Sequence, residues 1–324
     1  MTGLRNAREV AAERLTFLQE AVAASAALAA ADRLGVLTRL EAGPLDPAIL
    51  ARDCAIGERG ARLLVSALAG LGLVDRGRDG LYRTTGLDLE RLAWLRAPWD
   101  GLAEAIRDDL PAVAVDDPGE AEALYRNSVG YLGEIFAPAA ARATERLAGS
   151  RPRILDVGAG AAPWSLAIAA RDPACRVTAV ELPGVMPATR RAVDAAGEGD
   201  RFELVAGDLF TIDLGSAEYD LAIAGNICHL FDETANRDLL GRLHEALRPG
   251  GRVAIVDAIP DERLEGPRAV VLYALGLLLR TRAGRVYPFS TYAEWLREAG
   301  FEAIERSELS AAPPVTLITA TRRA

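Results

Sequence analysis

The sequence predicts an α/β protein in which a mostly parallel sheet, with helices on both faces, follows a smaller and mainly helical domain. From residue 152 onward, short apolar runs alternate with helical stretches, which is the pattern of a parallel sheet with crossover helices. Before that point the chain is largely helical. Its 324 residues, 50% of them hydrophobic, are enough for two domains with substantial cores.

The first element is a pair of helices within residues 9–40, interrupted at the segment DRLG. Ala, Leu and Val cover most of their circumference, so we expect these helices to be buried on several sides. Asp46 should cap the next helix, with Pro47 at its first position, and GERGARLLVSALAGLG predicts a further short helix that ends at glycine. A hairpin is expected within GLVDRGRDGLYRTT, with Asp79-Gly80 in its turn.

Two short helices followed by a hairpin are typical of a winged helix. A DNA-binding winged helix would place its second helix in the major groove with cations aimed at base edges, but that helix offers only Arg59 and Arg62, near its start. Residues 1–96 also carry almost equal numbers of arginine and acidic residues, whereas a DNA-binding domain is usually clearly basic. We therefore expect a dimerisation domain and keep DNA binding as an alternative.

The sheet is predicted from six apolar segments: RILDV, RVTAVEL, FELVAGD, YDLAIAG, GRVAIVD and, near the end, VTLITATR. Ligands of such sheets bind at the carboxyl ends of the strands. After the first segment, Gly158 and Gly160 allow a sharp turn and a close approach of the backbone to a ligand. A dinucleotide-binding turn has Gly or Ala at its third conserved position. This chain has Pro163 there, which removes an N–H group that a phosphate would use, so the turn favours a ligand without phosphate.

Acidic residues follow the second and third predicted strands. Glu181 ends the second strand, about 20 residues beyond the glycines, where a carboxylate accepts hydrogen bonds from ribose hydroxyls. Asp208 follows the third strand and is placed to accept a hydrogen bond from an adenine amino group, while Leu209 packs on the ring. Adenosine without phosphates indicates S-adenosylmethionine as the cofactor. The alternative interpretation of the two glycines is a tight turn that binds no ligand.

The composition narrows the class of partner. The net charge is −9, and all 37 lysine-or-arginine positions are arginine, so a nucleic acid is disfavoured as the main partner and a lysine Schiff base is excluded. The three cysteines lie far apart and give no usual zinc-site spacing with the two histidines, so we expect no metal and a reducing compartment. No apolar run reaches the ~20 residues needed to span a bilayer, and the start lacks a signal segment. These features predict a cytoplasmic protein with a small-molecule substrate and no membrane partner.

Five segments occur in one order behind the predicted winged helix: ILDVGAG, VELPGV, AGDLF, GNICHLFDETANRDLLGRLHEALRPGGRVAIVDAI and LREAGF. With these segments the chain resembles the bacterial and plant small-molecule O-methyltransferases that carry an N-terminal dimerisation domain. The resemblance covers essentially the whole chain and is strongest over residues 151–260. It implies a Rossmann-like methyltransferase sheet of seven strands that binds S-adenosylmethionine, a homodimer, and an acceptor pocket between the domains.

The resemblance also assigns roles by position. Asp156 would brace the first turn. His229 stands where the plant members have the base that deprotonates a phenol, and Asp257 matches one of the two carboxylates that flank that base. Val286 stands in the place of the other carboxylate. The residues implied to line the cofactor are Gly158, Gly160, Glu181, Asp208, Leu209, Gly225 and Asn226. A packed histidine with a satisfied hydrogen bond is the alternative for His229.

The implied organisation is a winged-helix dimerisation domain (1–96), a helical linker that contributes to the substrate pocket (97–150) and a cofactor-binding catalytic domain (151–324). The implied reaction is methyl transfer to an oxygen of a small aromatic or polyketide-like secondary metabolite, with His229 as candidate general base. The segment AVVLYALGLLL, which contains Tyr273, lies where such enzymes place a helix over the acceptor pocket, although core packing gives the same pattern. Two alternatives remain: an enzyme that uses the bound cofactor for decarboxylation, hydroxylation or cyclisation, and a DNA-binding regulator.

Overall fold

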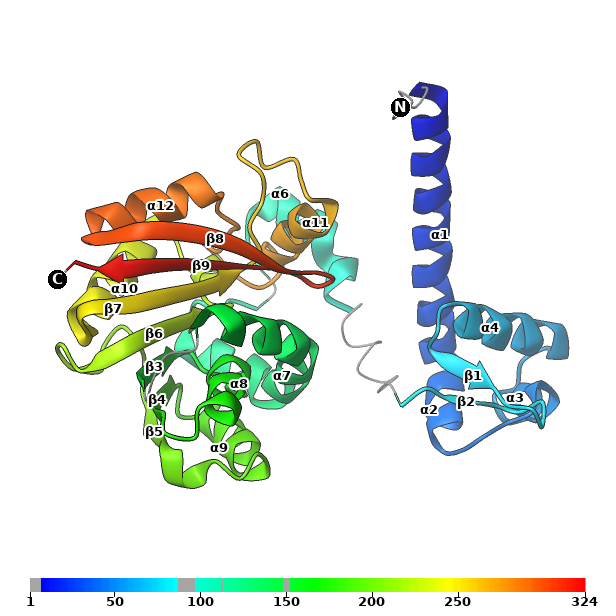
Figure 1. Cartoon of the computed structure of the whole chain (residues 1–324). Coiled ribbons are helices and arrows are strands. Elements are labelled where there is room, and N and C mark those ends of the chain that lie inside the picture. Colours follow the sequence, from blue (N-terminus) through cyan, green and yellow to red (C-terminus); the bar gives the residue numbers. More distant parts are fainter. Residues whose placement is uncertain (1–6, 87–96, 112, 148–151, 324) are drawn as a thin grey trace, which may run out of the picture. The chain divides into compact units, whose positions relative to one another are not determined.

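The computed structural model describes residues 7–86, 97–111, 113–147 and 152–323. The chain divides into two compact units, Met1–Leu102 and Ala103–Ala324 (Figure 1). The domain limits predicted at residues 96 and 150 fall in segments outside the described residues. None of the described helices combines the length and the hydropathy that a membrane span requires.

The first unit begins with the 27-residue helix α1 (Ala7–Arg33). It is followed at once by α2 (Val36–Glu41), whose N-cap residue Gly35 has a φ of 69°. A left-handed residue cannot continue a helix, and glycine adopts this conformation without a steric penalty. The interruption predicted at DRLG is therefore confirmed.

The expectation that α1 is buried on several sides does not hold in the single chain. Leu15, Leu18 and Val22 are 64%, 55% and 69% exposed. Among α1 residues 11–33, whose burial is described, only Ala29 and Ala31, near the carboxyl end, are buried. A helix of 27 residues is roughly 40 Å long, far longer than the short helices of this unit can cover. The three exposed residues follow each other at helical spacing and form an apolar stripe, which we call the α1 stripe.

The rest of the first unit follows the predicted order. Its elements are α3 (Pro47–Asp53), α4 (Glu58–Gly70), the antiparallel strands β1 (Val74–Arg76) and β2 (Tyr82–Thr84), and the short 3₁₀ helix η1 (Ala97–Gly101). The Asp46 carboxylate accepts a 2.7 Å hydrogen bond from the Ala48 N–H and so caps α3. Gly80, with a φ of 80°, lies in the turn between the two strands, and Asp79 accepts a hydrogen bond from the Leu81 N–H there. The predicted cap, helices and hairpin are confirmed.

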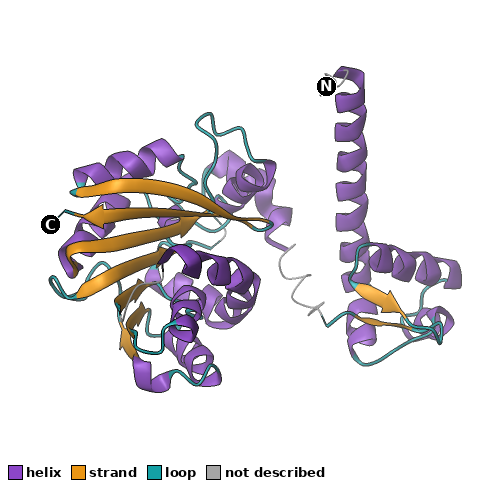
Figure 2. Ribbon diagram, in the orientation of Figure 1, coloured by secondary structure: helices purple, strands orange, loops and turns teal. Residues whose placement is uncertain are grey.

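The second unit contains one seven-stranded sheet (Figure 2). Its strands are β3 (Arg153–Val157), β4 (Arg176–Glu181), β5 (Phe202–Ala206), β6 (Tyr219–Gly225), β7 (Leu247–Asp257), β8 (Phe301–Ala311) and β9 (Pro314–Arg322). They lie in the order β5-β4-β3-β6-β7-β9-β8; β3 to β7 are parallel, and β9 runs antiparallel to both of its neighbours. The predicted mostly parallel sheet is confirmed. The six apolar segments correspond to six of its strands, and β8 is the seventh strand, which none of these segments predicted.

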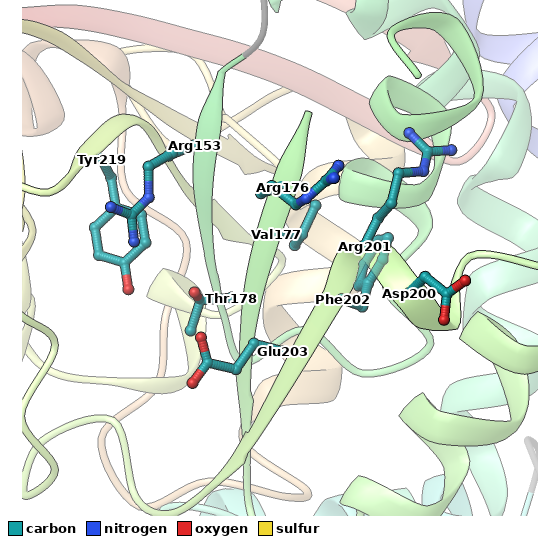
Figure 3. Close-up of a pocket in the computed structure, with 9 residues that line it drawn as sticks. All are labelled: Arg153, Arg176, Val177, Thr178, Asp200, Arg201, Phe202, Glu203 and Tyr219. Atoms are coloured by element: carbon teal, nitrogen blue, oxygen red, sulfur yellow. The ribbon is translucent and has the colours of Figure 1, made fainter. Parts of the chain in front are cut away.

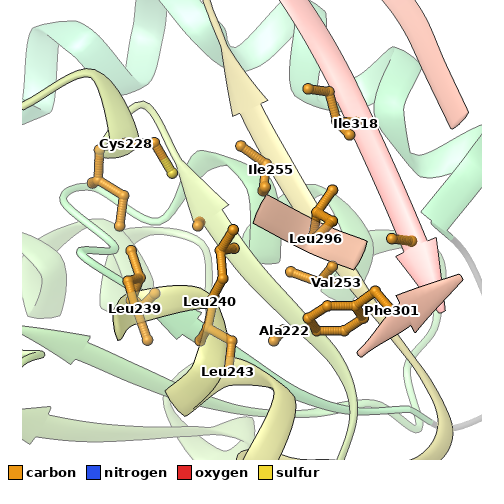
Figure 4. Packing of buried hydrophobic residues seen from close by; sticks show 14 of the residues in the cluster. Ala222, Cys228, Leu239, Leu240, Leu243, Val253, Ile255, Leu296, Phe301 and Ile318 are labelled. Atoms are coloured by element: carbon orange, nitrogen blue, oxygen red, sulfur yellow. The ribbon is translucent and has the colours of Figure 1, made fainter. Parts of the chain in front are cut away.

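Helices cover both faces of this sheet. The 3₁₀ and α-helical elements are α6 (Leu102–Asp108), α7 (Pro118–Leu147), α8 (Pro163–Arg171), α9 (Met186–Ala195), η2 (Gly199–Arg201), η3 (Cys228–Leu230), α10 (Glu233–Ala246), α11 (Arg268–Leu277) and α12 (Phe289–Glu298). Residues of α7, α8 and α9 pack on one face, and residues of α10 and α12 pack on the other. In Figure 4, Leu240 and Leu243 of α10 and Leu296 of α12 lie against Val253 and Ile255 of β7. Packed apolar side chains therefore cover both faces of the sheet.

The order of the strands places a topological switch point at one edge of the sheet. From β3 the chain proceeds outward to β4 and β5 and then returns to β6, on the other side of β3. The connections that leave β3 and β6 therefore diverge at the carboxyl ends of these strands, and ligands of open α/β sheets bind at such a point.

Candidate active site

The glycine-rich turn after β3 depends on the absence of side chains. Gly158 and Gly160 have φ angles of 62° and 57°, and a Cβ on Gly158 would stand 2.8 Å from a methyl carbon of Ile227. Pro163 lies in the first turn of α8, whose N-cap residue Ala162 is left-handed and donates no side-chain cap. The turn thus has bare backbone at its glycines and one N–H group fewer than an ordinary helix start.

Asp156 connects β3 to α8. Its side chain is 1% exposed, and its carboxyl accepts a hydrogen bond from the Ser165 hydroxyl. Burial raises the pKa of Asp156 to about 7, and the Ser165 hydrogen bond opposes this increase. The contact ties the end of β3 to the first turn of α8, which is the bracing position expected for Asp156.

Glu181 links the end of β4 to the glycine-rich turn. Its Oε2 accepts a 2.6 Å hydrogen bond from the Gly160 N–H, and its Oε1 accepts one of 2.7 Å from the Leu182 N–H. The carboxyl is almost fully buried, and this burial raises its pKa, while the two backbone hydrogen bonds act against the increase. Glu122 of α7, which accepts a 2.9 Å hydrogen bond from the Gly184 N–H, raises it further. A buried carboxylate is therefore fixed beside the turn at the carboxyl edge of the sheet.

Asp208 lies at the neighbouring strand end. Ala206, the last residue of β5, pairs with Glu181 in the sheet, so the Asp208 position follows directly beyond that pair. The Asp208 carboxylate accepts a 2.9 Å hydrogen bond from the Phe210 N–H, and Leu209 packs, partly buried, against the core. The structure thus brings the acids of β4 and β5 to the same edge.

The end of β6 is shaped by one missing side chain and one strained residue. A Cβ on Gly225 would overlap the indole of Trp164, so glycine is needed there for packing. Asn226 has a φ of 60°, and its N–H donates a 2.7 Å hydrogen bond to the Val256 carbonyl oxygen. Its side-chain Oδ1 is buried and has no hydrogen-bond partner among the described residues. A buried acceptor without a donor indicates a place for a ligand, because such a group is costly when it stays unpaired.

His229 and Asp257 form a buried pair at the ends of adjacent strands. His229 lies in η3, directly after β6, and Asp257 is the last residue of β7. The imidazole Nδ1 and the carboxylate Oδ1 are 2.6 Å apart, and the two side chains are 4% and 1% exposed. The sequence-based expectation that these two residues meet is confirmed.

Asp257 holds the imidazole through several other hydrogen bonds. Its Oδ2 accepts from the His229 backbone N–H at 3.1 Å and from the Tyr292 hydroxyl at 3.1 Å, and its Oδ1 accepts from the Ala258 N–H at 2.8 Å. A carboxylate surrounded by donors stays an acceptor, so we assign the Nδ1–H tautomer to His229. The opposite nitrogen, Nε2, then carries the lone pair.

Tyr273 is the partner of that lone pair. Its hydroxyl lies 2.6 Å from Nε2, and the two rings meet edge to face with centroids 5.2 Å apart. Val286, at the position where the resemblance places a second carboxylate, is buried in an apolar cluster with Leu230 and Ala258. The sequence indicated Tyr273 only as part of an apolar helix, and it contained no indication of Tyr292, because both contacts depend on how α11 and α12 are rotated against the sheet.

Two other features lie apart from this group. A surface hollow of about 370 Å³ is lined by residues at the amino ends of the strands, among them Arg153, Arg176, Phe202 and Tyr219 (Figure 3). It is at the opposite edge of the sheet and contains none of the predicted site residues. His244 packs edge to face on Phe301, and burial lowers the pKa of its imidazole.

The geometry agrees with the comparisons to known proteins. The family model of the O-methyltransferase domain matches residues 114–302. A 3-hydroxy-5-methyl-1-naphthoate 3-O-methyltransferase of Streptomyces sahachiroi is 32% identical over 84% of this chain and 84% of its own length. A tetracenomycin polyketide synthesis 8-O-methyltransferase of Streptomyces glaucescens is 27% identical, over 88% of this chain and 90% of its own. The crystal structure of human N-acetylserotonin methyltransferase in complex with SAM superimposes with a TM-score of 0.76 at 23% identity and covers 100% of both chains, so the two share a fold. This chain belongs to the O-methyltransferase family.

Proposed function

We propose that this enzyme transfers the methyl group of S-adenosylmethionine to a hydroxyl group of a small aromatic or polyketide-like secondary metabolite, with His229 as the general base. The observation that carries the proposal is the buried His229–Asp257 pair at the carboxyl edge of the sheet. The names of the two Streptomyces relatives, which refer to a hydroxynaphthoate and a polyketide, support the substrate class. Membership of the family favours methyl transfer over decarboxylation, hydroxylation or cyclisation.

The residues at the carboxyl edge of the sheet suit S-adenosylmethionine better than a phosphorylated nucleotide. Pro163 weakens the helix start as a phosphate site, whereas Glu181 offers a buried carboxylate for ribose hydroxyls. The unpaired Oδ1 of Asn226 is an acceptor suited to an ammonium group such as that of the methionine part. When bound, the cofactor supplies a methyl group on a positively charged sulfur. The proposed lining is Gly158, Gly160, Glu181, Asp208, Leu209, Gly225 and Asn226, with Asp156 as the brace of the turn.

His229 and Asp257 are suited to remove a proton from a hydroxyl. A neutral hydroxyl is a slow methyl acceptor because positive charge builds on its oxygen as the new bond forms, and a positioned base contributes ~10²–10⁴-fold by removing the proton. The Nε2 lone pair of His229 would take that proton, and the adjacent Asp257 carboxylate would stabilise the resulting imidazolium. The apolar residues around the pair, including Leu230 and Val286, keep water away from it.

The first unit is proposed to make the enzyme a homodimer. The α1 stripe exposes three large apolar side chains at helical spacing, and a second copy of the chain would bury them. We retain residues 1–96 as a winged-helix dimerisation domain, 97–150 as a linker that contributes to the acceptor pocket, 151–324 as the catalytic domain, and the cytoplasm as the location. The helix, helix and hairpin order of the first unit supports a winged helix. Its balanced charge supports dimerisation over DNA binding.

The test is methyl transfer in vitro. The purified protein is incubated with S-adenosylmethionine and a panel of phenols, headed by 3-hydroxy-5-methyl-1-naphthoate, and products are identified by mass and by nuclear magnetic resonance. The expected product carries one more methyl group on oxygen, and His229→Ala should lower its rate by ~10²–10⁴-fold with unchanged cofactor affinity. A protein that binds no S-adenosylmethionine, or that methylates carbon or nitrogen only, would show the proposal to be wrong.

A further inference from the structure

The lone pair of the proposed base does not face open space. Nδ1 of His229 is committed to Asp257 at 2.6 Å, so the imidazole accepts a proton through Nε2. Within the described parts of the chain, the hydroxyl that hydrogen-bonds to Nε2 is that of Tyr273, at 2.6 Å. The His229 side chain is only 4% exposed, so a proton reaches Nε2 either through Tyr273 or after Tyr273 has moved away.

The surroundings of Tyr273 keep its phenol neutral and in place. The ring packs among apolar side chains of one cluster, among them Val270 and Leu277 of its own helix α11 and Val286. The guanidinium of Arg280 lies over the ring, 4.9 Å from its centroid. Burial raises the pKa of the Tyr273 phenol, while Arg280 opposes the increase. A neutral phenol donates one hydrogen bond and still accepts another through its oxygen.

We propose that Tyr273 is a further catalytic residue, which relays the proton of the acceptor hydroxyl to Nε2 of His229. This proposal rests on the proposed function, in which His229 is the final proton acceptor. The acceptor proton passes to the Tyr273 oxygen while the proton of Tyr273 passes to Nε2, so the phenol is neutral before and after the step. The acceptor oxygen uses the electron pair of its former O–H bond for the new bond to the methyl carbon, and the pair of the broken carbon–sulfur bond stays on sulfur.

Hydrogen bonding favours the relay over displacement of Tyr273. Moving the phenol aside would break its 2.6 Å hydrogen bond to Nε2 and take the ring away from the Arg280 guanidinium that lies over it. In the relay Nε2 and the phenol oxygen both keep a hydrogen bond throughout, and the acceptor hydroxyl adds one to an oxygen that has a lone pair to spare. Arg280 adds to this, because its positive charge stabilises negative charge that gathers on the phenol oxygen as the two protons move.

The experiment compares Tyr273→Phe with a matched control, Tyr219→Phe. The substitution keeps the ring that packs under Arg280 and removes only the hydroxyl. Tyr219 is another buried tyrosine, at the amino end of β6 and thus at the opposite edge of the sheet. The probe is the phenol of the panel that the unmodified enzyme methylates fastest. We expect kcat of Tyr273→Phe to fall ~10²-fold or more, as for the loss of a proton-transfer group, with KM for the phenol and the affinity for S-adenosylmethionine unchanged, and Tyr219→Phe to keep its rate.

Two further measurements separate a relay from a structural role. If both protons move in one step, the rate of the unmodified enzyme should depend on the deuterium fraction of the solvent along a curve and not along a straight line. An enzyme with 3-fluorotyrosine at position 273, which keeps the phenol hydroxyl, should recover most of the activity that Tyr273→Phe loses. In the free protein, the ¹⁵N resonance of Nε2 should shift when Tyr273 becomes Phe, while the Nδ1–H tautomer persists.

The outcomes distinguish the relay from the function on which it rests. Loss of turnover in both His229→Ala and Tyr273→Phe, with folded proteins that bind the cofactor, supports the relay. Loss in His229→Ala, with Tyr273→Phe within about tenfold of the unmodified rate, refutes the relay and leaves the base in place. Full activity of His229→Ala, or no methylation of any phenol, refutes the proposed function and the relay with it.

Discussion

The Asp257→Asn substitution tests the proposed base because it changes one atom of a buried carboxylate and almost none of its volume. Asp257 accepts hydrogen bonds from Nδ1 and N–H of His229, from the Ala258 N–H and from the Tyr292 hydroxyl. Each carboxylate oxygen receives two of these four donors. Asparagine keeps one oxygen and replaces the other with an NH₂ group. At one of the two positions, the N–H or O–H groups that donated to the carboxylate therefore face another hydrogen-bond donor.

The structure indicates how this conflict would be relieved. If the NH₂ group faces Nδ1, the imidazole becomes an acceptor there and carries its proton on Nε2, which removes the lone pair needed for catalysis. If it faces the other side, the His229 N–H and the Tyr292 hydroxyl lose their acceptor, at a cost of about 1–3 kcal/mol for each unpaired buried donor. Both arrangements also remove the negative charge that stabilises the imidazolium. We expect kcat to fall ~10²–10⁴-fold, the contribution of a general base.

The assay measures initial rates at saturating cofactor and phenol, cofactor affinity by calorimetry, and unfolding in denaturant. Asp257→Asn should unfold at a lower denaturant concentration and bind the cofactor with unchanged affinity. Asp232→Asn is the matched control, since Asp232 caps α10 at the surface through the Ala235 N–H, and asparagine caps helices equally well. A folded Asp257→Asn enzyme with more than about a tenth of the original kcat would refute the reasoning.

Three further predictions concern the cofactor site, the brace and the first unit. Asp208→Ala should weaken S-adenosylmethionine binding by about 1–3 kcal/mol in calorimetry, as for an unpaired adenine amino group, and NAD should not bind; an unchanged affinity would mean that the adenine lies elsewhere. Because burial raises the pKa of Asp156 from 3.8 to about 7, the folded state holds a proton that the unfolded state releases, so the stability from this group falls as the pH rises from 4 to 7. The melting temperature of the unmodified protein relative to Asp156→Asn should therefore decrease between pH 5 and pH 8, and a constant difference would contradict the assignment. Light scattering at micromolar concentration should report the mass of two chains, which we expect to share an interface above ~2,000 Å². Leu18→Glu in the α1 stripe should shift the mass toward one chain, and a monomeric unmodified protein would refute the dimer.

The sheet could be predicted from the sequence because its central strands are buried on both faces. Such strands are continuous apolar runs, as in YDLAIAG of β6, and these runs stand out between helices. The edge strand β8 could not be found in the same way. Within the part of the chain that the structure describes, it pairs with β9 alone. Most of its residues are exposed or half-buried, and its segment FEAIERSELSA alternates irregularly around two shifts of register. The exposure of α1 was also beyond prediction, because composition does not say what covers a helix.

The site also contains some residues that could be predicted from the sequence and others that could not. Residues at strand ends could be predicted, because parallel strands bring their carboxyl ends to one edge; Glu181, Asp208 and the His229–Asp257 pair all follow from that rule. Contacts made by helices that pack across this edge could not. The rotation of α11 decides whether the Tyr273 hydroxyl contacts the imidazole or an apolar side chain. Because this helix is apolar on almost every side, its sequence periodicity does not define a buried face.

The order of the site residues along the chain bears on how such an enzyme diversifies. Every residue proposed for the cofactor lies between Asp156 and Asn226, and every residue proposed for the proton path lies after it, from His229 to Tyr273. The segment between β7 and α12 carries α11, whose Tyr273 meets the base, and enters the sheet nowhere along its length. A change within this segment would therefore alter the proposed proton path and leave the residues proposed for the methyl donor unchanged.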